Sequence, residues 1–127
     1  MGFMPLSQLL LSKDANYPWL ILVPQRANVT ELHHLRAKDR QQLLRESMTL
    51  SDAMEELFKP EKLNVAALGN QVPQLHIHHI ARYKTDPAWP RPVWGAVEPV
   101  EYPGELLEER LQAIRQALNL EEFFPPG

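Results

Sequence analysis

Apolar and polar residues along the chain fall into blocks that predict four strands and two helices. The segment 6–14 has the pattern of a strand that ends in polar residues. The continuous apolar run 19–24, bounded by prolines, is typical of a buried strand. Asp14, Asn16 and Pro18 favour a turn between them. The first two strands are therefore expected to pair as an antiparallel hairpin.

A long amphipathic helix is predicted to begin near Ala37 and to end before Pro60. Its apolar residues recur at steps of three and four, with charged residues between them. The apolar stripe consists of Leu43, Ser47, Leu50, Met54 and Leu57, and Leu44 and Met48 widen it. This stripe is expected to face the core or a second subunit.

The second half of the chain predicts two further strands and a C-terminal helix. The strands are expected at 62–68 and 74–83, separated by a loop at 69–73. Proline-rich residues 84–104 predict an ordered loop without regular structure. The helix is expected at about 105–119, and its apolar stripe is Leu107, Leu111, Ile114 and Leu118.

The order strand, strand, helix, strand, strand, helix, with short connections, predicts an α+β fold in which an antiparallel sheet carries a long helix and a C-terminal helix. At 127 residues the chain is expected to be one domain. Its core would lie at about 6–83, followed by the proline- and tryptophan-rich loop 84–104 and the C-terminal helix. A chain of this length buries roughly two-thirds of its unfolded surface.

Composition narrows the possible partners only a little. The net charge of -3 gives no overall basic field for nucleic acid. The chain has no cysteine, which excludes a disulfide scaffold and thiolate metal sites. No apolar run reaches the length of a membrane span, and the N-terminus lacks the features of a signal peptide. A cytoplasmic protein that binds neither nucleic acid nor membrane is therefore expected.

The most unusual stretch is QLHIHHIAR, residues 74–82, which holds three of the five histidines. Side chains of a strand alternate between its two faces. Gln74, His76 and His78 would thus share one face, whereas His79 would point to the opposite face. The pattern predicts a histidine pair beside a carboxamide, with the third histidine near the helix layer.

Three explanations fit this pattern. Two imidazoles one residue apart on a strand can bind zinc, although a closed site needs further ligands. A neutral imidazole can also attack phosphorus while neighbouring N–H groups hold the phosphate oxygens. Finally, an exposed edge strand can carry polar residues with no further role. The spacing of the histidines does not choose among the three.

The stretch GNQVPQLHIHHIAR, residues 69–82, resembles the signature of the histidine triad (HIT) family, in which three histidines alternate with apolar residues. The best register places Gln74, His76 and His78 at the three triad positions. The likeness extends over about residues 6–82 and is closest to bacterial members with a PQLHIH motif and a DPAWPxPVWG loop. A competing register ends on Ile80, which cannot donate a hydrogen bond to phosphate.

The resemblance implies a hydrolase or nucleotidyl transferase that acts on a nucleoside phosphate conjugate, either a dinucleoside polyphosphate or a phosphoramidate. The second histidine, His76, would attack the α-phosphorus and form a covalent nucleotidyl-histidine. His78 would lie beside the phosphate oxygens, while a set of substrate-binding residues would comprise Gln74, Asn70, Gln71 and Arg82. Family members need no metal or other cofactor for this chemistry, and commonly form homodimers through the long helix and a strand edge.

Two positions depart from the family pattern, and each affects what is expected. Glutamine replaces the first triad histidine at Gln74, which leaves the nucleophile intact but affects phosphate contacts and departure of the leaving group. This departure favours an alternative, a nucleotide-binding module without turnover. His79 occupies an apolar position and is expected to pack near the helix. A histidine metal site is the third hypothesis.

The remaining candidates are interpreted mainly as structural. His33 and His34 are expected to be polar surface groups before the long helix. The loop from Trp89 to Trp94 could stack on a base, but it is more simply a rigid clamp over the core.

Overall fold

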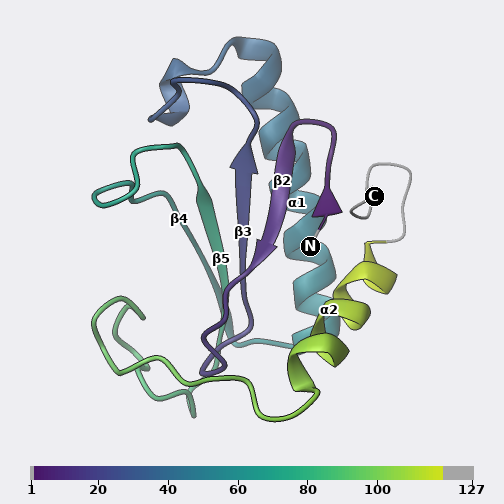
Figure 1. Ribbon diagram of the computed structural model, residues 1–127, viewed down its shortest axis with the longest axis vertical. Coiled ribbons are helices and arrows are strands. Elements are labelled where there is room, and N and C mark those ends of the chain that lie inside the picture. The colour runs from purple at the N-terminus through teal and green to yellow at the C-terminus, as the bar shows by residue number, and fades with distance from the viewer. Residues whose placement is uncertain (1, 119–127) are drawn as a thin grey trace.

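The computed structural model describes residues 2–118, which form a five-stranded antiparallel sheet and two α-helices (Figure 1). The strand order is β1-β2-β3-β5-β4, and all neighbouring strands are antiparallel. This architecture confirms the predicted α+β class. The strands are β1 Gly2–Phe3, β2 Ser7–Leu11, β3 Trp19–Pro24, β4 Lys62–Ala66 and β5 Ile77–Arg82, and the helices are α1 Ala37–Phe58 and α2 Leu106–Ala117.

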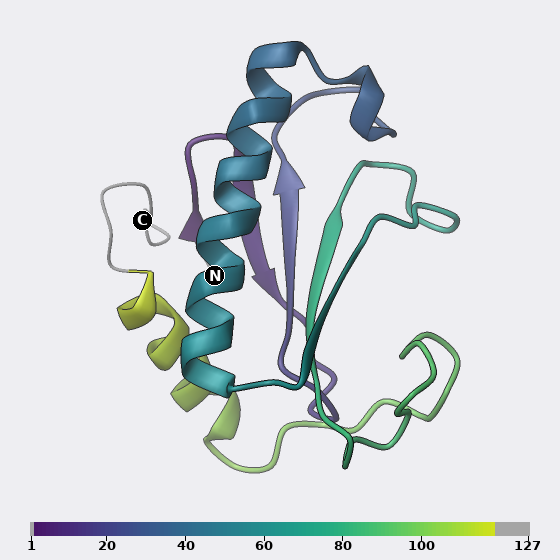
Figure 2. The ribbon, with the colours of Figure 1, turned by 180° about the vertical axis from the view of Figure 1, so that it is seen from behind.

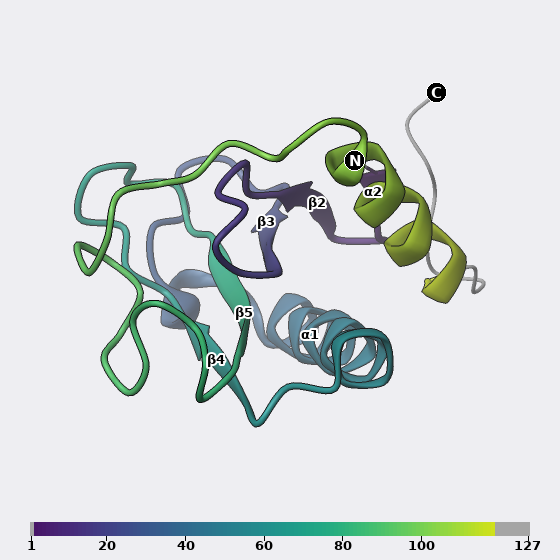
Figure 3. The ribbon, with the colours of Figure 1, turned by 90° about the horizontal axis from the view of Figure 1, so that it is seen from below.

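Helix α1 covers one face of the sheet, as the views from behind and from below show (Figures 2 and 3). Leu9, Leu20 and Leu22 point to this helix face and are fully buried against Leu50 and Met54 of α1. Burying a side chain of this size contributes roughly 1.5–3 kcal/mol relative to leaving it exposed. Helix α2 packs against α1 and adds Ile114 and Leu118 to the same core.

The predicted bounds of α1 are close to the observed ones. The helix ends at Phe58, and Lys59 follows in a left-handed conformation with φ of 47° before Pro60. The buried face also carries Glu46, which the apolar pattern did not single out. Its Oε2 accepts a hydrogen bond from the backbone N–H of Leu6 at 2.7 Å, so this carboxylate ties the helix to the start of β2.

A second, smaller core lies on the opposite face of the sheet, at the end where residues 84–104 cross it (Figure 3). It joins Tyr17 and Ile80 to Ala88 and Val93 of that loop, all of them buried. The loop contains turns but neither a strand nor a helix, as the sequence predicts. The rest of this face is not covered by a helix, and it is the face that carries His78.

Several strand limits differ from the sequence-based expectation, and β2 ends at Leu11 rather than at residue 14. Strand β5 begins at Ile77 rather than at residue 74, because the N–H of Leu75 donates to the carbonyl of Val29 in the connection after β3. Strand β4 ends at Ala66 rather than at residue 68. Strand β1 has two residues, too few to show a periodic pattern, and it was not predicted.

The connection before α1 contains one 3₁₀ turn, Leu32–His34, which was also not expected. Within residues 2–118, neither helix has the length and apolar content required to cross a bilayer.

Candidate active site

The structure brings His76 and His78 together on the face of the sheet opposite α1. His78 lies within β5 and pairs with Ile21 of β3, while His76 immediately precedes the strand. The two imidazole centroids are 4.9 Å apart and the rings are inclined by 77°. His76 is half-buried, whereas His78 is 7% exposed. The pair therefore has one accessible ring and one largely enclosed ring, both aimed to the same side as the alternation predicts.

The backbone fixes the tautomer of His76. Its Nδ1 lies 2.7 Å from the carbonyl oxygen of Gln74. Because a carbonyl can only accept a hydrogen bond, Nδ1 must carry the proton. The neutral ring then holds its lone pair on Nε2, the nitrogen turned away from the backbone. This is the form in which an imidazole acts as a nucleophile.

The tautomer of His78 is the opposite one. The indole N–H of Trp19 donates to Nδ1 of His78 at 3.0 Å. Because an indole N–H can only donate, Nδ1 must hold the lone pair and the proton of the neutral ring is on Nε2. Burial, together with the neighbouring His76, lowers the pKa of His78 to about 4. His78 is therefore a neutral hydrogen-bond donor at physiological pH.

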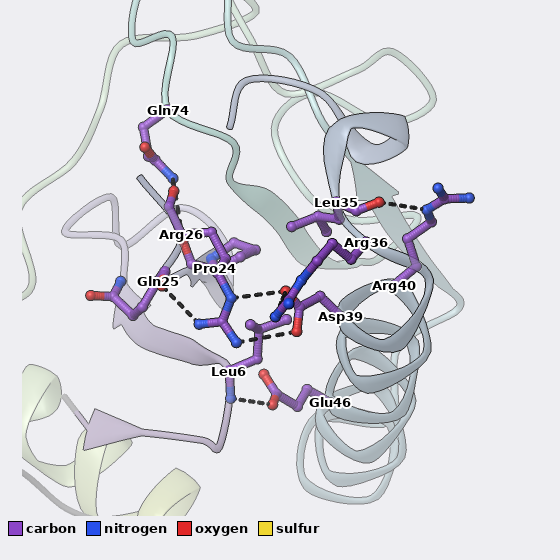
Figure 4. A network of polar contacts seen from close by, with 10 residues as sticks. All are labelled: Leu6, Pro24, Gln25, Arg26, Leu35, Arg36, Asp39, Arg40, Glu46 and Gln74. Atoms are coloured by element: carbon purple, nitrogen blue, oxygen red, sulfur yellow. Dashed lines mark hydrogen bonds and ion pairs between the residues drawn. The ribbon is translucent and has the colours of Figure 1, made fainter. Parts of the chain in front are cut away.

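Gln74 lies beside the pair, but its amide group points to the backbone (Figure 4). Nε2 donates to the carbonyls of Pro24 and Arg26, each at 3.2 Å. Both amide hydrogens are thus directed at protein acceptors, and donation to phosphate would require the side chain to turn. The amide-bearing residues Asn70 and Gln71 are exposed in the loop between β4 and β5.

The same close-up explains why the segment after β3 is held in place. The guanidinium of Arg26 forms two hydrogen bonds with the carboxylate of Asp39 at the start of α1, at 2.8 and 3.1 Å (Figure 4). This ion pair lowers the pKa of Asp39, chiefly through the hydrogen bond from Arg26. The carbonyls that receive the Gln74 amide therefore belong to a segment anchored on α1.

Arg82 is not part of this site. It lies at the far end of β5, six residues beyond His76, a separation of roughly 20 Å at about 3.3 Å per residue. Its guanidinium is buried and donates to the carboxylate of Asp86, to Asn64 and to the carbonyl of Arg91. The sequence-based assignment of Arg82 to substrate binding is not supported by this geometry, because its donors anchor the loop instead.

His79 points to the opposite face, as the alternation of the strand predicts. Its Nε2 lies 2.7 Å from the hydroxyl of Ser47 on α1, and its Nδ1 lies 3.2 Å from the carbonyl of Ile77. Burial lowers its pKa to about 4, although the Ile77 carbonyl acts in the other direction. Because His79 faces α1, the three neighbouring histidines do not converge on one ion. No group of three potential metal ligands occurs anywhere in residues 2–118.

Trp19 and Trp94 enclose His78, a role that the sequence does not predict for either residue. The Trp19 and Trp94 ring centroids lie 5.6 and 5.1 Å from that of His78. From the sequence alone, Trp19 is only part of an apolar strand. Its role depends on the register between β3 and β5, and no local pattern reports that register. The loop residue Trp89 instead lies over the Arg82 guanidinium, at 5.8 Å.

A cavity of about 510 Å³ adjoins the two indoles on the side of the hairpin turn and the loop. Asp14, Glu98, Trp19 and Trp94 are among the residues that line it. Elsewhere, His33 and His34 are exposed in the 3₁₀ turn, and their rings pack against each other with centroids 4.5 Å apart. These two histidines are surface groups, consistent with their interpretation from the sequence.

Comparison with known proteins gives one consistent result. The family model described as the HIT domain matches residues 1–85. A histidine triad protein from Bradyrhizobium japonicum is 47% identical, with a TM-score of 0.90 over 92% of this chain and 87% of that chain. A histidine triad protein from Marinobacter aquaeolei VT8 is 50% identical, with a TM-score of 0.85 over 92% of this chain and 85% of that chain.

A histidine triad (HIT) protein from Sinorhizobium meliloti 1021 is 38% identical, with a TM-score of 0.86 over 91% of this chain and 89% of that chain. No curated protein matches the chain significantly. These similarities confirm the family resemblance that the histidine stretch suggested. They also extend beyond the residues that the HIT domain model matches, into the loop and α2.

Proposed function

The chain belongs to the histidine triad family, and on that basis we propose that it is a hydrolase or nucleotidyl transferase that uses His76 as a covalent nucleophile at the α-phosphate of a nucleoside phosphate conjugate. The observation that carries the proposal is the 2.7 Å contact between His76 Nδ1 and the carbonyl of Gln74. It leaves the Nε2 lone pair available on a half-buried, accessible ring. His78, fixed as a donor, lies 4.9 Å away between ring centroids.

In the first step, Nε2 of His76 forms a bond to the α-phosphorus. The bond from phosphorus to the leaving group breaks on the opposite side, and the leaving group takes that electron pair. The His76 ring becomes cationic, with phosphorus on Nε2 and the original proton still on Nδ1. The Gln74 carbonyl stabilises this charge by accepting the Nδ1–H hydrogen bond.

In the second step, water or another acceptor attacks the same phosphorus. The bond from His76 Nε2 to phosphorus breaks, and its electron pair returns to the ring as the lone pair. The attacking water gives up a proton to the surrounding solvent, and a nucleoside monophosphate is released. Covalent catalysis of this kind replaces one difficult displacement with two easier ones.

The phosphate oxygens require donors, and the site offers several. The Nε2–H of His78 is the fixed donor, and such preset groups stabilise developing negative charge without reorganisation. Asn70 and Gln71 are exposed in the preceding loop and are proposed to contact the phosphate or the leaving group through side chain or backbone. Gln74 is proposed to join them, after its amide turns from the carbonyls of Pro24 and Arg26.

A non-catalytic nucleotide-binding module is the second candidate. The observation that favours it is the position of the Gln74 amide, which is held by two backbone carbonyls rather than presented to a ligand. A carboxamide also has no titratable proton to give to a leaving group. In this case the same loop and histidine pair would bind the phosphate without breaking a bond.

The two candidates separate in one experiment. Dinucleoside polyphosphates and nucleoside phosphoramidates with each common base are incubated with wild type, His76→Ala and the surface control His33→Ala. Release of nucleoside monophosphate is followed by ³¹P NMR, and intact mass spectrometry detects the nucleotidyl adduct. We expect release and adduct in wild type and in the control, and neither in His76→Ala.

Loss of a covalent nucleophile lowers turnover by on the order of 10⁴-fold or more. Equal, background-level release from all three proteins across the panel would contradict the enzymatic proposal. Calorimetry on the same ligands would then identify the binding module, if a nucleotide binds without being consumed.

We further propose that the protein forms a homodimer through α1 and β4. Strand β4 lies at one edge of the sheet, so its outer backbone groups have no partner strand among residues 2–118. A groove of about 380 Å³ lies where β4 adjoins α1, and its lining is predominantly apolar. Leu44, Met48 and Val65 in this lining are 61%, 48% and 48% exposed.

Apolar patches of this kind mark interaction sites. A second copy of the chain fits the groove because it offers the same two elements. Two β4 edges can pair, while the exposed leucine and methionine of each α1 pack across the two-fold axis. Such an isologous contact is the commonest form of oligomer.

A further inference from the structure

We propose that Trp19 is a positioning residue of the active site, whose indole N–H holds His78 in the single tautomer that presents Nε2–H to the phosphate. The role assigned to His78 rests on the proposed function, whereas its tautomer can be observed without any substrate. The inference goes beyond the triad itself, because Trp19 lies on β3, far from the histidine stretch in sequence.

The geometry of the contact leaves one arrangement of protons. Trp19 Nε1 and His78 Nδ1 are 3.0 Å apart, within normal hydrogen-bond distance. The indole nitrogen is a donor and has no acceptor role. With the proton of His78 on Nδ1, two N–H groups would face each other at a residue that is only 7% exposed. That tautomer is disfavoured, and so is the imidazolium, which also carries a proton on Nδ1.

Trp19 is itself held firmly in this orientation. Its ring contacts Tyr17 and Trp94 edge-on, with centroids 6.3 and 5.8 Å away, and its backbone pairs with Ile80 of β5. Tyr17, Ile80 and Val93 belong to the small core against which Trp19 packs. The donor therefore cannot swing away without disturbing the loop that covers this end of the sheet.

The ionisable groups around His78 are few. His76 faces it from the same chain segment, and its proximity acts with burial to lower the pKa of His78 to about 4. Trp19 and Trp94, the aromatic neighbours from β3 and the loop, carry no charge. Asp14 and Glu98 line the cavity that adjoins those indoles, and neither contributes to the lowered pKa of His78. Ala66 of β4, the cross-strand partner of His78, is uncharged. The surroundings of His78, like the indole donor, thus favour the neutral ring over the imidazolium.

The fixed tautomer limits what His78 can do. If its Nε2–H proton were transferred to a leaving group, the ring would become an anion, because Nδ1 has no proton to keep. A buried imidazolate is far too costly at neutral pH. His78 therefore stabilises phosphate oxygens as a hydrogen-bond donor and does not supply the proton of the leaving group.

The tautomer can be measured directly in the wild-type protein. Two-bond ¹⁵N–¹H correlation spectra of uniformly labelled protein at pH 7 distinguish a protonated from an unprotonated ring nitrogen. We expect His78 to show unprotonated Nδ1 and protonated Nε2, and His76 to show the reverse. A scalar coupling across the hydrogen bond between Trp19 Nε1 and His78 Nδ1 is expected in addition. Protonated Nδ1 on His78 would overturn the inference.

Two matched substitutions isolate the indole N–H. Trp19→Phe keeps an aromatic ring beside His78 but removes the donor, and we expect a mixture of His78 tautomers and a raised His78 pKa. Trp94→Phe also replaces a ring that contacts His78, but its indole is not the hydrogen-bond donor, so the tautomer is expected to persist. An unchanged tautomer in folded Trp19→Phe would contradict the inference. If Trp19→Phe does not fold, the wild-type coupling decides alone.

Activity then separates this inference from the proposed function. If wild type turns over substrate, Trp19→Phe is expected to lose several-fold in kcat/KM at pH 7 and more at pH 5, where the freed His78 becomes protonated. If wild type shows the expected tautomer but no turnover, the positioning role of Trp19 stands and the enzymatic proposal fails. Full turnover with a mixed tautomer in Trp19→Phe would show that the tautomer does not matter for the reaction.

Discussion

Three histidines within four residues have three different environments, and each is set by the partners of its ring nitrogens. His76 donates to the Gln74 carbonyl and keeps its lone pair on the outer nitrogen. His78 accepts a hydrogen bond from Trp19 at Nδ1 and keeps its own proton on Nε2. His79 lies on the other face, at the Ser47 hydroxyl. Identical side chains can therefore serve different proposed roles, with His76 as nucleophile and His78 as donor, while His79 links the sheet to α1.

The residues beside His76 also predict which leaving groups the enzyme prefers. Neither Gln74 nor the fixed His78 can deliver a proton, so good leaving groups should depart much faster than amines. We expect wild type to cleave phosphoanhydrides faster than phosphoramidates, and Gln74→His to accelerate phosphoramidates selectively. Restoring a general acid gains on the order of 10²-fold. Steady-state rates on matched substrate pairs measure this ratio, with exposed Gln25→His as the control. Equal acceleration of both substrates would contradict the assignment.

At the scale of elements, α1 and β5 are joined by the Ser47–His79 hydrogen bond inside the core. His79 is fully buried, and burial is the main cause of its low pKa, about 4. In the unfolded chain a histidine titrates near 6.5. Between these values the unfolded state binds a proton that the folded state does not, so stability is complete above pH 6.5 and is lost as the pH falls towards 4.

We therefore expect the free energy of unfolding to decrease by as much as about 3 kcal/mol from His79 alone over this range. His78 adds a similar dependence, since its pKa is lowered in the same way. Urea titrations at intervals between pH 7 and 4.5 should show a shallower decline in His79→Gln than in wild type. Exposed His34→Gln serves as the control and should keep the wild-type slope. Parallel curves for all three proteins would refute the prediction.

The loop that follows β5 is held by one buried ion pair. Arg82 and Asp86 meet at 2.8 Å, and both side chains are 3% exposed. Burial alone would raise the pKa of Asp86, but hydrogen bonds from Arg82 and three backbone amides lower it to about 2. The carboxylate therefore stabilises the fold above pH 4, and that stability is lost as the pH falls towards 2.

Removing one partner of this pair leaves the other charge buried and uncompensated. We expect Asp86→Ala to lower the free energy of unfolding by about 3–5 kcal/mol. Asp52→Ala, at an exposed position of α1, is the matched control and should change it little. Denaturant unfolding followed by tryptophan fluorescence measures both. A loss below about 1 kcal/mol in Asp86→Ala would show that the loop is held by its apolar contacts instead.

At the scale of the whole molecule, the proposal concerns the surface that faces a second copy of the chain. The proposed dimer buries exposed apolar residues of α1 and the free edge of β4. Met48→Glu places a charge at the centre of this groove and is expected to convert the dimer to a monomer, because an unpaired charge in an apolar interface is strongly unfavourable. Sedimentation velocity measures the mass.

Val100→Glu, on an equally exposed apolar position of the loop, provides the control and should leave the dimer unchanged. A wild-type monomer at all concentrations would exclude the proposed interface. A dimer that persists in Met48→Glu would place the contact on another surface.

Periodicity and breaker residues were sufficient to predict most of the fold. The apolar stripe and Pro60 placed α1 within two residues, and the alternation of the histidine strand put His76 and His78 on one face and His79 on the other. These features depend on the repeat of a helix or strand, which is local and is written directly in the order of residues. The family motif added the expected nucleophile.

Only the tertiary structure decided which distant residues contact the histidine stretch. Trp19 meets His78 because β3 and β5 pair in one register. The guanidinium of Arg82 lies away from the histidine pair and donates to Asp86 and Asn64. The Gln74 amide likewise donates to the carbonyls of Pro24, at the end of β3, and of Arg26. Such contacts join residues distant in sequence, and they are selected by the packing of the whole sheet, so no local pattern encodes them. Sequence determined where the imidazoles point, and packing determined that Nδ1 of His78 meets the indole of Trp19 and that Nε2 of His79 meets the hydroxyl of Ser47.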